Sequence, residues 1–120
     1  MDERVPAIAP PTKLLWAIFD ARDEWEETPL YEAIIRVLES HNIAGVTVLS
    51  GLAGYGAHRA SHRKGLMIGA PHDRPIVLLV AENDAKLRAV LPTVRSMIPE
   101  GVVMLTDAEV IPFRPDGDRE

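Results

Sequence analysis

Four apolar runs alternate with two amphipathic stretches along this chain, and their order limits the possible folds more than any other feature. Short continuous apolar runs are typical of buried strands, whereas an apolar stripe that returns every three or four residues is typical of a helix. One amphipathic stretch lies between the first and second runs, and the other lies between the third and fourth. The strand-like runs are KLLWAIF (13–19), AGVTVLSGL (44–52), RPIVLLVA (74–81) and VVMLTDAEVI (102–111).

The first amphipathic stretch is expected to begin at Thr28 and Pro29. Threonine can accept hydrogen bonds from the first amides of a helix, and proline in the first turn sacrifices no hydrogen bond. Asn42 favours the left-handed conformation that ends many helices, and His41 is expected to cap the helix or pack in the core rather than act in catalysis. The apolar stripe consists of Leu30, Ile34, Val37, Leu38 and His41.

The second amphipathic stretch carries signals for a start, a stop and an interruption. Asn83 or Asp84 can cap its beginning, and Pro99 and Gly101 end it. Pro92 lacks the amide that a helix interior needs, so it is expected to kink the helix or to split it into two parts. The apolar stripe consists of Leu87, Val90, Leu91, Val94 and Met97 or Ile98.

The order of these elements predicts an α+β, ferredoxin-like βαββαβ sandwich with a long loop between the second and third strands. Both helices are expected to cover one face of an antiparallel sheet. The strands are apolar on both sides, so the open face predicts self-association, with Trp16 and Trp25 packed in the core or in the interface. The expected division of the chain is a flexible arm (1–11), one domain (12–112) and a flexible tail (113–120).

Composition narrows the class of protein further. The 120 residues are 47% hydrophobic and 26% charged, which suits one globular domain, and none of them is a cysteine. Disulfides, thiolate nucleophiles and cysteine-based zinc sites are therefore excluded. No apolar run approaches the roughly 20 residues that span a bilayer, and MDERVPAIAPPTK does not resemble a signal peptide. We expect a cytoplasmic protein whose net charge of −5 argues against nucleic-acid binding.

The negative charge is unevenly distributed along the chain. Residues 54–74 hold four bases against one acid, which makes this segment +3 and leaves −8 for the remainder. Three of the four histidines lie in the same segment. A basic segment directly after a run of glycines is suited to meet an anion. The bases are Arg59, Arg63, Lys64 and Arg74, and the acid is Asp73.

Gly51, Gly54 and Gly56 have a spacing similar to that of a dinucleotide-binding fingerprint. That fingerprint needs a helix directly behind it, and AHRASHRKG is not a convincing helix, so we reject this interpretation. The glycines can permit a bulge and a tight exit from the strand, or they can present amides to an anion, and both interpretations stay open. The side chains that can clamp a phosphate or carboxylate, or else form a solvated loop, are His58, Arg59, His62, Arg63 and Lys64.

Metal binding and hydrolysis are the weaker alternatives. His58 and His62 are four residues apart, a spacing that suits a metal only on a helix, and His72 is the sole evident third ligand. The acids of DARDEWEE (20–27) lack the loop pattern of a calcium site and indicate a solvated connection. No set of nucleophile, base and acid stands out. We therefore expect no catalytic residue, no metal site and no required cofactor.

Three stretches carry a family resemblance: DEWEETPLYEAIIRVLESHNIAGVTVLSGLAGYGA, HDRPIVLLVAEND and MIPEGVVMLTDAEVI. Together they resemble the bacterial-type PII-like proteins described as domain of unknown function 190, over residues 13–111. The resemblance implies a homotrimer around a three-fold axis. It also implies a small-molecule sensor that binds nucleotides or other ligands in clefts between subunits and signals through a mobile loop.

The resemblance also assigns particular residues. Gly54-Tyr55-Gly56 matches the turn that leads into the mobile loop, which makes Tyr55 a candidate ligand residue, and residues 57–73 match the loop, in which His62 is singled out. MIPEGVV departs from PII proteins, because it has one glycine and no base where they carry a glycine-rich phosphate loop.

The function that the resemblance implies is that of a non-enzymatic trimeric regulator. It would sense an anionic small molecule, for which a nucleotide is one candidate, and act on a membrane or cytoplasmic protein. The alternatives are a ligand-independent trimeric protein-interaction module and, less favoured, a metal-binding protein or a small hydrolase.

Overall fold

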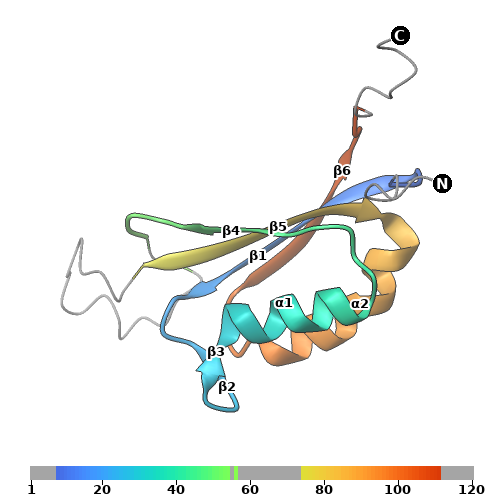
Figure 1. Cartoon of the computed structure of the whole chain (residues 1–120). Coiled ribbons are helices and arrows are strands. Elements are labelled where there is room, and N and C mark those ends of the chain that lie inside the picture. Colours follow the sequence, from blue (N-terminus) through green and yellow to red (C-terminus); the bar gives the residue numbers. More distant parts are fainter. Residues whose placement is uncertain (1–7, 55, 57–73, 112–120) are drawn as a thin grey trace, which may run out of the picture.

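The computed structural model describes residues 8–54, 56 and 74–111 of the chain. Figure 1 shows one sheet with two helices against one of its faces and a small hairpin beside them. The hairpin consists of β2 (Glu24–Trp25) and β3 (Thr28–Pro29), and the helices are α1 (Leu30–Ser40) and α2 (Asp84–Met97). The strands of the main sheet are β1 (Thr12–Asp20), β4 (Thr47–Ser50), β5 (Pro75–Asn83) and β6 (Val102–Ala108).

The strands lie in the order β4-β5-β1-β6, and all neighbours are antiparallel. Each helix joins an edge strand to one of the two central strands, which is the arrangement of a ferredoxin-like βαββαβ sandwich. The predicted fold class is confirmed. The first apolar run of the sequence forms β1, a central strand, because both of its edges find a partner and both of its faces are apolar.

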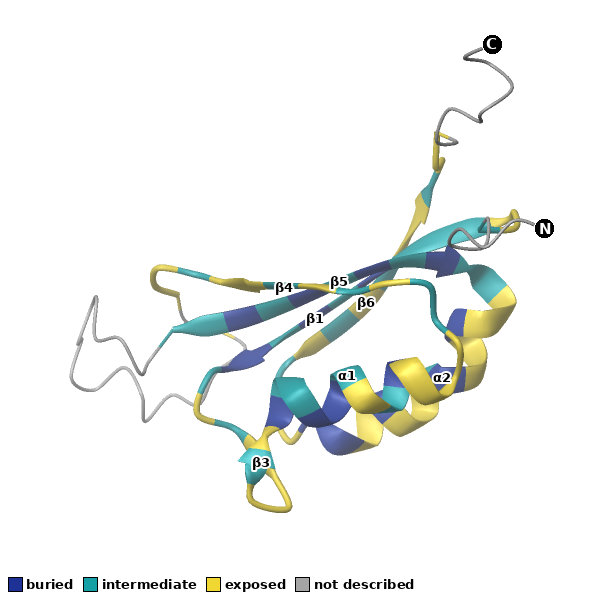
Figure 2. Cartoon of the chain, viewed as in Figure 1, coloured by how far each residue is buried: buried dark blue, intermediate teal, exposed yellow. Residues whose placement is uncertain are grey.

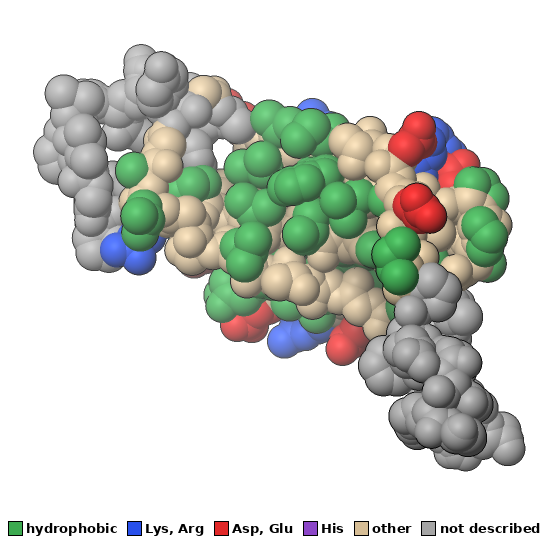
Figure 3. Space-filling view, turned by 90° about the horizontal axis from the view of Figure 1, so that it is seen from above, with side chains coloured by type: hydrophobic (Ala, Val, Ile, Leu, Met, Phe, Trp, Pro, Cys, Tyr) green, Lys and Arg blue, Asp and Glu red, His purple; other side chains and the backbone are tan. Residues whose placement is uncertain are grey.

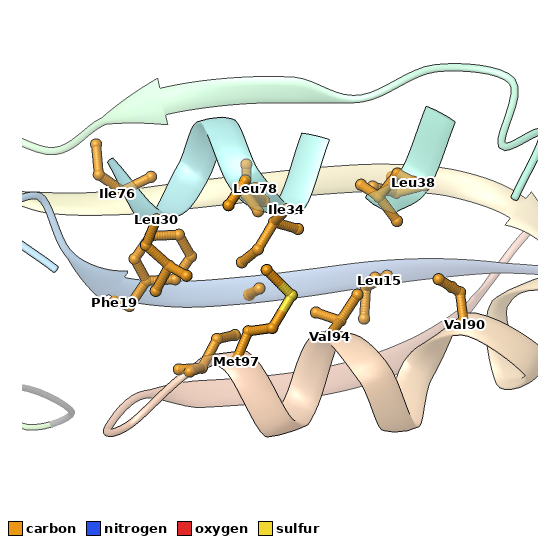
Figure 4. Close-up of a cluster of buried hydrophobic side chains, with 14 of the residues drawn as sticks. Leu15, Phe19, Leu30, Ile34, Leu38, Ile76, Leu78, Val90, Val94 and Met97 are labelled. Atoms are coloured by element: carbon orange, nitrogen blue, oxygen red, sulfur yellow. The ribbon is translucent and has the colours of Figure 1, made fainter. Parts of the chain in front are cut away.

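Alternation along the central strands builds the core. In β1 the side chains of Leu15, Ala17 and Phe19 are buried under the helices, and in β5 those of Ile76 and Leu78 are buried with them. Figure 4 shows these side chains meeting Leu30, Ile34 and Leu38 from α1 and Val90, Val94 and Met97 from α2. Figure 2 shows the same buried stripe running between the sheet and the helices. Burying each large apolar side chain contributes about 1.5–3 kcal/mol, so this layer accounts for most of the stability of the fold.

The stripe predicted for α1 is buried at Leu30, Ile34 and Leu38, and the end of the helix agrees with expectation, but its start does not. Thr28 lies in β3 and does not cap the helix, whose N-cap is Pro29 with no side-chain cap hydrogen bond. His41 is the C-cap residue, as one of its two expected roles had it; it is exposed, and its Nδ1 lies 3.0 Å from the carbonyl of Val37. The left-handed conformation predicted for Asn42 is present, with φ of 60°.

In α2, Asn83, one of the two residues predicted as caps, caps the helix, and Pro92, predicted to kink or to split it, does not split it. The Asn83 side chain accepts hydrogen bonds from the amides of Ala85 at 2.9 Å and Lys86 at 3.2 Å. The helix continues through Pro92 without a break. Pro92 is exposed, so the carbonyl that loses its partner there can be solvated, and the buried stripe on the opposite side holds both halves together.

The acidic connection predicted after β1 contains the β2–β3 hairpin, which the sequence did not indicate. Its two-residue turn places Glu26 and Glu27 at φ of 50° and 68°, the conformation that a tight two-residue hairpin demands at both positions. Trp25 is 37% exposed, so of its two expected places the core of this chain is ruled out and an interface stays a prediction. The short ladder of two residue pairs holds Trp25 at the surface.

Neither helix in the described part of the chain has the length and hydrophobicity that a bilayer crossing requires. The division into arm, domain and tail stays a prediction. The last residues of the proposed arm do make contacts, since the carbonyl of Pro11 accepts a hydrogen bond from the amide of Asp84 at 2.8 Å.

Candidate functional site

The face of the sheet opposite the helices is apolar. Figure 3 looks onto this face and shows hydrophobic side chains gathered over its centre, with charged groups only at the margins. The strand register arranges the side chains in rows across neighbouring strands. These rows are Thr47, Leu79, Trp16 and Met104; Leu49, Val77, Ile18 and Val102; and Ala81, Leu14 and Thr106.

Several members of this open face remain accessible to solvent. Leu49 is 48% exposed on β4, and Val102 and Met104 are 38% and 43% exposed on β6. Trp16, at the centre, is partly buried by its neighbours on β5 and β6. No described element covers this face, so a surface from outside the described residues is needed to bury it.

One end of the sheet holds the glycines that the sequence singled out. We call this the glycine end and define it by residues 20–22, 51–54 and 74–75. The amide of Gly51 donates to the carbonyl of Pro75 at 2.7 Å, and a Cβ on Gly51 would lie 2.6 Å from Cγ of the same proline. A glycine is therefore needed at position 51 so that the chain can leave β4 close to the ring of Pro75. For Gly51, this contact favours the interpretation that the glycine permits a tight exit from the strand.

Gly54 and Gly56 differ from Gly51. A Cβ on Gly54 would make only ordinary contact with Pro75 at 3.7 Å, and Gly54 is exposed. Gly56 has a φ of 113°, a backbone conformation that residues other than glycine rarely adopt, and no atom of the described residues beyond its chain neighbours lies within 4 Å of where its Cβ would be. The structure thus brings Gly51 and Gly54 together at Pro75. The other candidate residues, Tyr55, His58, Arg59, His62, Arg63 and Lys64, lie outside the described residues and stay predictions.

Sequence reasoning counted Arg74 only as a charge, and the structure gives it a defined position at the glycine end. Its carbonyl accepts a hydrogen bond from the amide of Ala21 at 3.0 Å, which joins the start of β5 to the end of β1. The Nε atom of Arg74 is buried and makes no hydrogen bond in the part of the chain that the structure describes. Arg22, at the same end, has its Nε 3.3 Å from the carboxylate of Asp20. In the sequence, the only feature that could have drawn attention to Arg74 was its position directly before Pro75, which begins β5.

The opposite end of the sheet is densely hydrogen-bonded. We call this the capped end and define it by residues 9–13, 42–44, 82–86 and 107–108. The buried carboxylate of Glu82 accepts from the amide of Ala44 at 2.9 Å and lies 3.6 Å from Nζ of Lys86, which donates to the carbonyl of Asn42 at 2.6 Å. These contacts tie the connection after α1 to β5 and α2.

The strands at the capped end also carry an exposed ion pair. Nζ of Lys13 on β1 lies 2.5 Å from the carboxylate of Asp107 on β6. This hydrogen bond and the positive charge of the lysine lower the pKa of Asp107 below its ordinary value.

Among the described residues, no three histidine or acidic side chains are grouped as metal ligands would be. His58, His62 and His72 lie outside those residues. The glycine of MIPEGVV, Gly101, lies against the backbone carbonyl of Ile18, where a Cβ would collide. This glycine is required by close packing on β1.

The sheet order, the helices on one face and the open apolar face define a ferredoxin-like protein of the PII and CutA1 type. A crystal structure of CutA1 from Pyrococcus horikoshii is similar in fold, with a TM-score of 0.55 at 13% identity over 89% of this chain and 91% of that chain. The chain belongs to the family described as domain of unknown function 190, "Uncharacterized ACR", whose profile matches residues 12–110.

A relative in Methanocaldococcus jannaschii, the UPF0166 protein MJ1524, is 24% identical over 99 residues, which span 82% of this chain and 90% of the relative. The names of this relative and of the family state no activity. The family predicted from the sequence motifs is confirmed, and its function has to be argued from the site.

Proposed function

We propose that this protein is a non-enzymatic, trimeric, PII-like regulator. In this proposal the open faces of three copies pack together, and an anionic small molecule binds in the clefts between them near Gly51–Gly56. Residues 57–73 then respond to the ligand and contact a membrane or cytoplasmic protein. The mechanism is a population shift, in which the ligand stabilises the conformation it contacts better.

The observation that carries the proposal is the open apolar face. Three rows of mainly apolar side chains, two of which cross all four strands, lie around Trp16, and the charged groups are at the margins. Covering such a face with a copy of itself removes apolar area from water at about 25 cal/mol per Å². Self-association also places the glycine end of one copy beside a neighbouring copy, where a cleft can form.

The oligomeric state is tested by measuring the native mass with light scattering after gel filtration. A trimer has three times the 13.2 kDa mass of the chain. Met104→Glu and Leu49→Glu each place a charge on the open face, and Ala89→Glu places the same charge on the exposed side of α2 as a matched control. The face variants are expected to dissociate and the control to remain assembled. A monomeric wild-type protein would refute the assembly.

Ligand sensing is tested by calorimetry against a panel of nucleotides and other anionic metabolites. Arg59→Ala and Arg63→Ala remove two bases of the segment whose charge contrast supports the ligand hypothesis. Each variant is expected to weaken binding of whichever compound the wild type binds. Unchanged affinity in both variants would remove residues 57–73 from the binding site.

The packing of Gly101 favours a second candidate function, a ligand-independent trimeric protein-interaction module. In this candidate the connection between α2 and β6 is a packed turn against Ile18, so it provides no phosphate cradle. Limited proteolysis of residues 57–73 distinguishes the two candidates. Identical cleavage with and without the metabolite panel supports the module, whereas protection by a compound supports the sensor.

A further inference from the structure

The glycine end contains a cationic side chain whose hydrogen-bonding capacity is unmet. Nε of Arg74 is buried and has no hydrogen-bond partner, and no ion pair forms at its guanidinium group among the described residues. The other arginine of this end, Arg22, pairs with Asp20. A buried donor without an acceptor destabilises a fold, so its presence at one defined position calls for an acceptor from outside the described chain.

The backbone around Arg74 holds this group in one place. Its carbonyl is bonded to the amide of Ala21, and the next residue, Pro75, is bonded to the amide of Gly51. Arg74 therefore lies between the ends of β1 and β4, beside the glycines. An acceptor bound here would contact an arginine whose backbone is already held in place, which lowers the cost of ordering the site.

The dipole of α1 is oriented so that it favours an anion at the glycine end. Alternation along β5 places Arg74 on the side of Ile76, which packs with Phe19 and Leu30 in the outermost layer of the core (Figure 4). Leu30 is the first residue of α1, and the beginning of this helix has no side-chain cap. The positive end of its dipole thus faces the end of the sheet that carries Arg74.

We infer that Arg74 binds an oxyanion group, a phosphate or a carboxylate, of the compound that this protein senses. The inference rests on the proposed function and identifies the residue in the body of the protomer that holds the charge. The guanidinium fork matches both kinds of oxyanion with two parallel hydrogen bonds. Among the described residues, the carboxylate nearest in the strand register, that of Asp20, is buried beside Pro75 and is neutralised by the guanidinium group of Arg22. The carboxylates of the β2–β3 hairpin, Glu24, Glu26 and Glu27, are exposed, and their repulsion is screened by water and salt.

Three variants separate anion binding from packing of the arginine stem. Arg74→Met keeps an apolar stem and removes the guanidinium group, and Arg74→Lys keeps the charge but loses the fork and Nε. Arg36→Met makes the same change in charge at an exposed position on α1 and is the matched control. Each protein is titrated calorimetrically with inorganic phosphate and with citrate. Its midpoint of thermal unfolding is measured in either anion against sodium chloride at equal ionic strength.

Wild type and Arg36→Met are expected to bind and to gain the same rise in unfolding midpoint. Arg74→Met is expected to weaken binding about tenfold or more, because charge-assisted hydrogen bonds are lost. The affinity of Arg74→Lys is expected to lie between those of the wild type and Arg74→Met. In chloride alone, Arg74→Met is expected to unfold at the wild-type midpoint or above it, since the unmet donor is gone. A response to phosphate alone or to citrate alone identifies the oxyanion.

Two results would overturn the inference. If Arg74→Met binds as tightly as wild type, the arginine is a packing residue, while the proposed sensor function stands and the anion binds elsewhere. If wild type binds neither anion nor any compound of the metabolite panel, both the inference and the sensor function fail. A drop in the chloride midpoint of Arg74→Met, with binding unchanged, also identifies a packing role.

Discussion

The capped end and the glycine end belong to the same four strands, yet their polar groups are treated in opposite ways. At the capped end Glu82 and Asn83 each satisfy several partners, including backbone groups of the connection after α1 and of residues 9–11. At the glycine end the carboxylate of Asp20 accepts hydrogen bonds from the amide and the guanidinium group of Arg22, and backbone hydrogen bonds join the strand ends, but the buried Nε of Arg74 is left without a partner in the described chain.

This difference indicates which end is built for stability and which is suited to binding. A buried polar group that is fully hydrogen-bonded holds its surroundings in one arrangement, whereas an unmet donor makes the local structure sensitive to whatever supplies an acceptor. Substitutions at the capped end should therefore cost more stability than substitutions at the glycine end.

The largest effect is expected at the capped end, from Glu82→Ala. The substitution leaves the amide of Ala44 without its acceptor, removes the partner of Lys86 and opens a cavity under the sheet. The free energy of unfolding is expected to fall by about 3 kcal/mol, since a buried hydrogen-bonded charge is deleted while its partners remain. Urea unfolding measures this change.

Glu82→Gln is the matched control, because the amide keeps the volume and an acceptor for Ala44. It is expected to lose about 1 kcal/mol or less, since the net value of the ion pair is small once desolvation is counted. Wild-type stability in Glu82→Ala would show that the capped end does not depend on this carboxylate. The contrast between the two ends would then disappear.

A smaller effect is expected at the glycine end, from Gly51→Ala. The new Cβ would lie 2.6 Å from Cγ of Pro75, so the ring or the strand exit must shift. The expected cost is about 1–2 kcal/mol, the usual range for overpacking at a site that can partly relax. Gly45→Ala is the control, since a Cβ there meets nothing within 4 Å, and it is expected to be neutral or slightly stabilising. Equal unfolding midpoints for the two variants would contradict the packing role of Gly51.

The smallest effect is expected from Asp107→Asn, which removes the exposed ion pair with Lys13 at the capped end. The pKa of Asp107 is lowered in the folded protein, so this carboxylate stabilises the fold at pH values above its ordinary value of 3.8. That contribution is lost as the pH falls through the lower folded value. The difference in thermal midpoint between wild type and variant should be small near neutrality and vanish in acid. A difference that persists or grows in acid would contradict this assignment.

Much of the architecture could be predicted from local patterns in the sequence. The stripe through Leu30, Ile34 and Leu38 identified α1, and Asn83 was identified as a cap because its side chain bonds amides two and three residues ahead. The open apolar face followed from strands that are apolar on both sides. The errors were also local, since Thr28 entered a hairpin instead of capping and Pro92 was accommodated on an exposed surface.

The candidate site was predictable only in part. The glycine run and the basic residues that follow it drew attention to one connection, and the structure confirmed that Gly51 and Gly54 meet at Pro75. Arg74 was not singled out, because its unmet Nε depends on what lies around it after the sheet has assembled. Nothing in the neighbouring sequence distinguishes it from a solvated surface arginine.

The sequence by itself determined the type and order of the four main strands and two helices, the family and the apolar character of both sheet faces, but not the β2–β3 hairpin. These properties arise from hydrophobic periodicity and short-range capping, which act between residues close together in the chain. Only the tertiary structure decided that Glu82 satisfies an amide 38 residues earlier and that Nε of Arg74 is buried without a partner among the described residues. Whether a polar group is satisfied depends on contacts between distant segments, and those contacts exist only once the sheet and helices have packed.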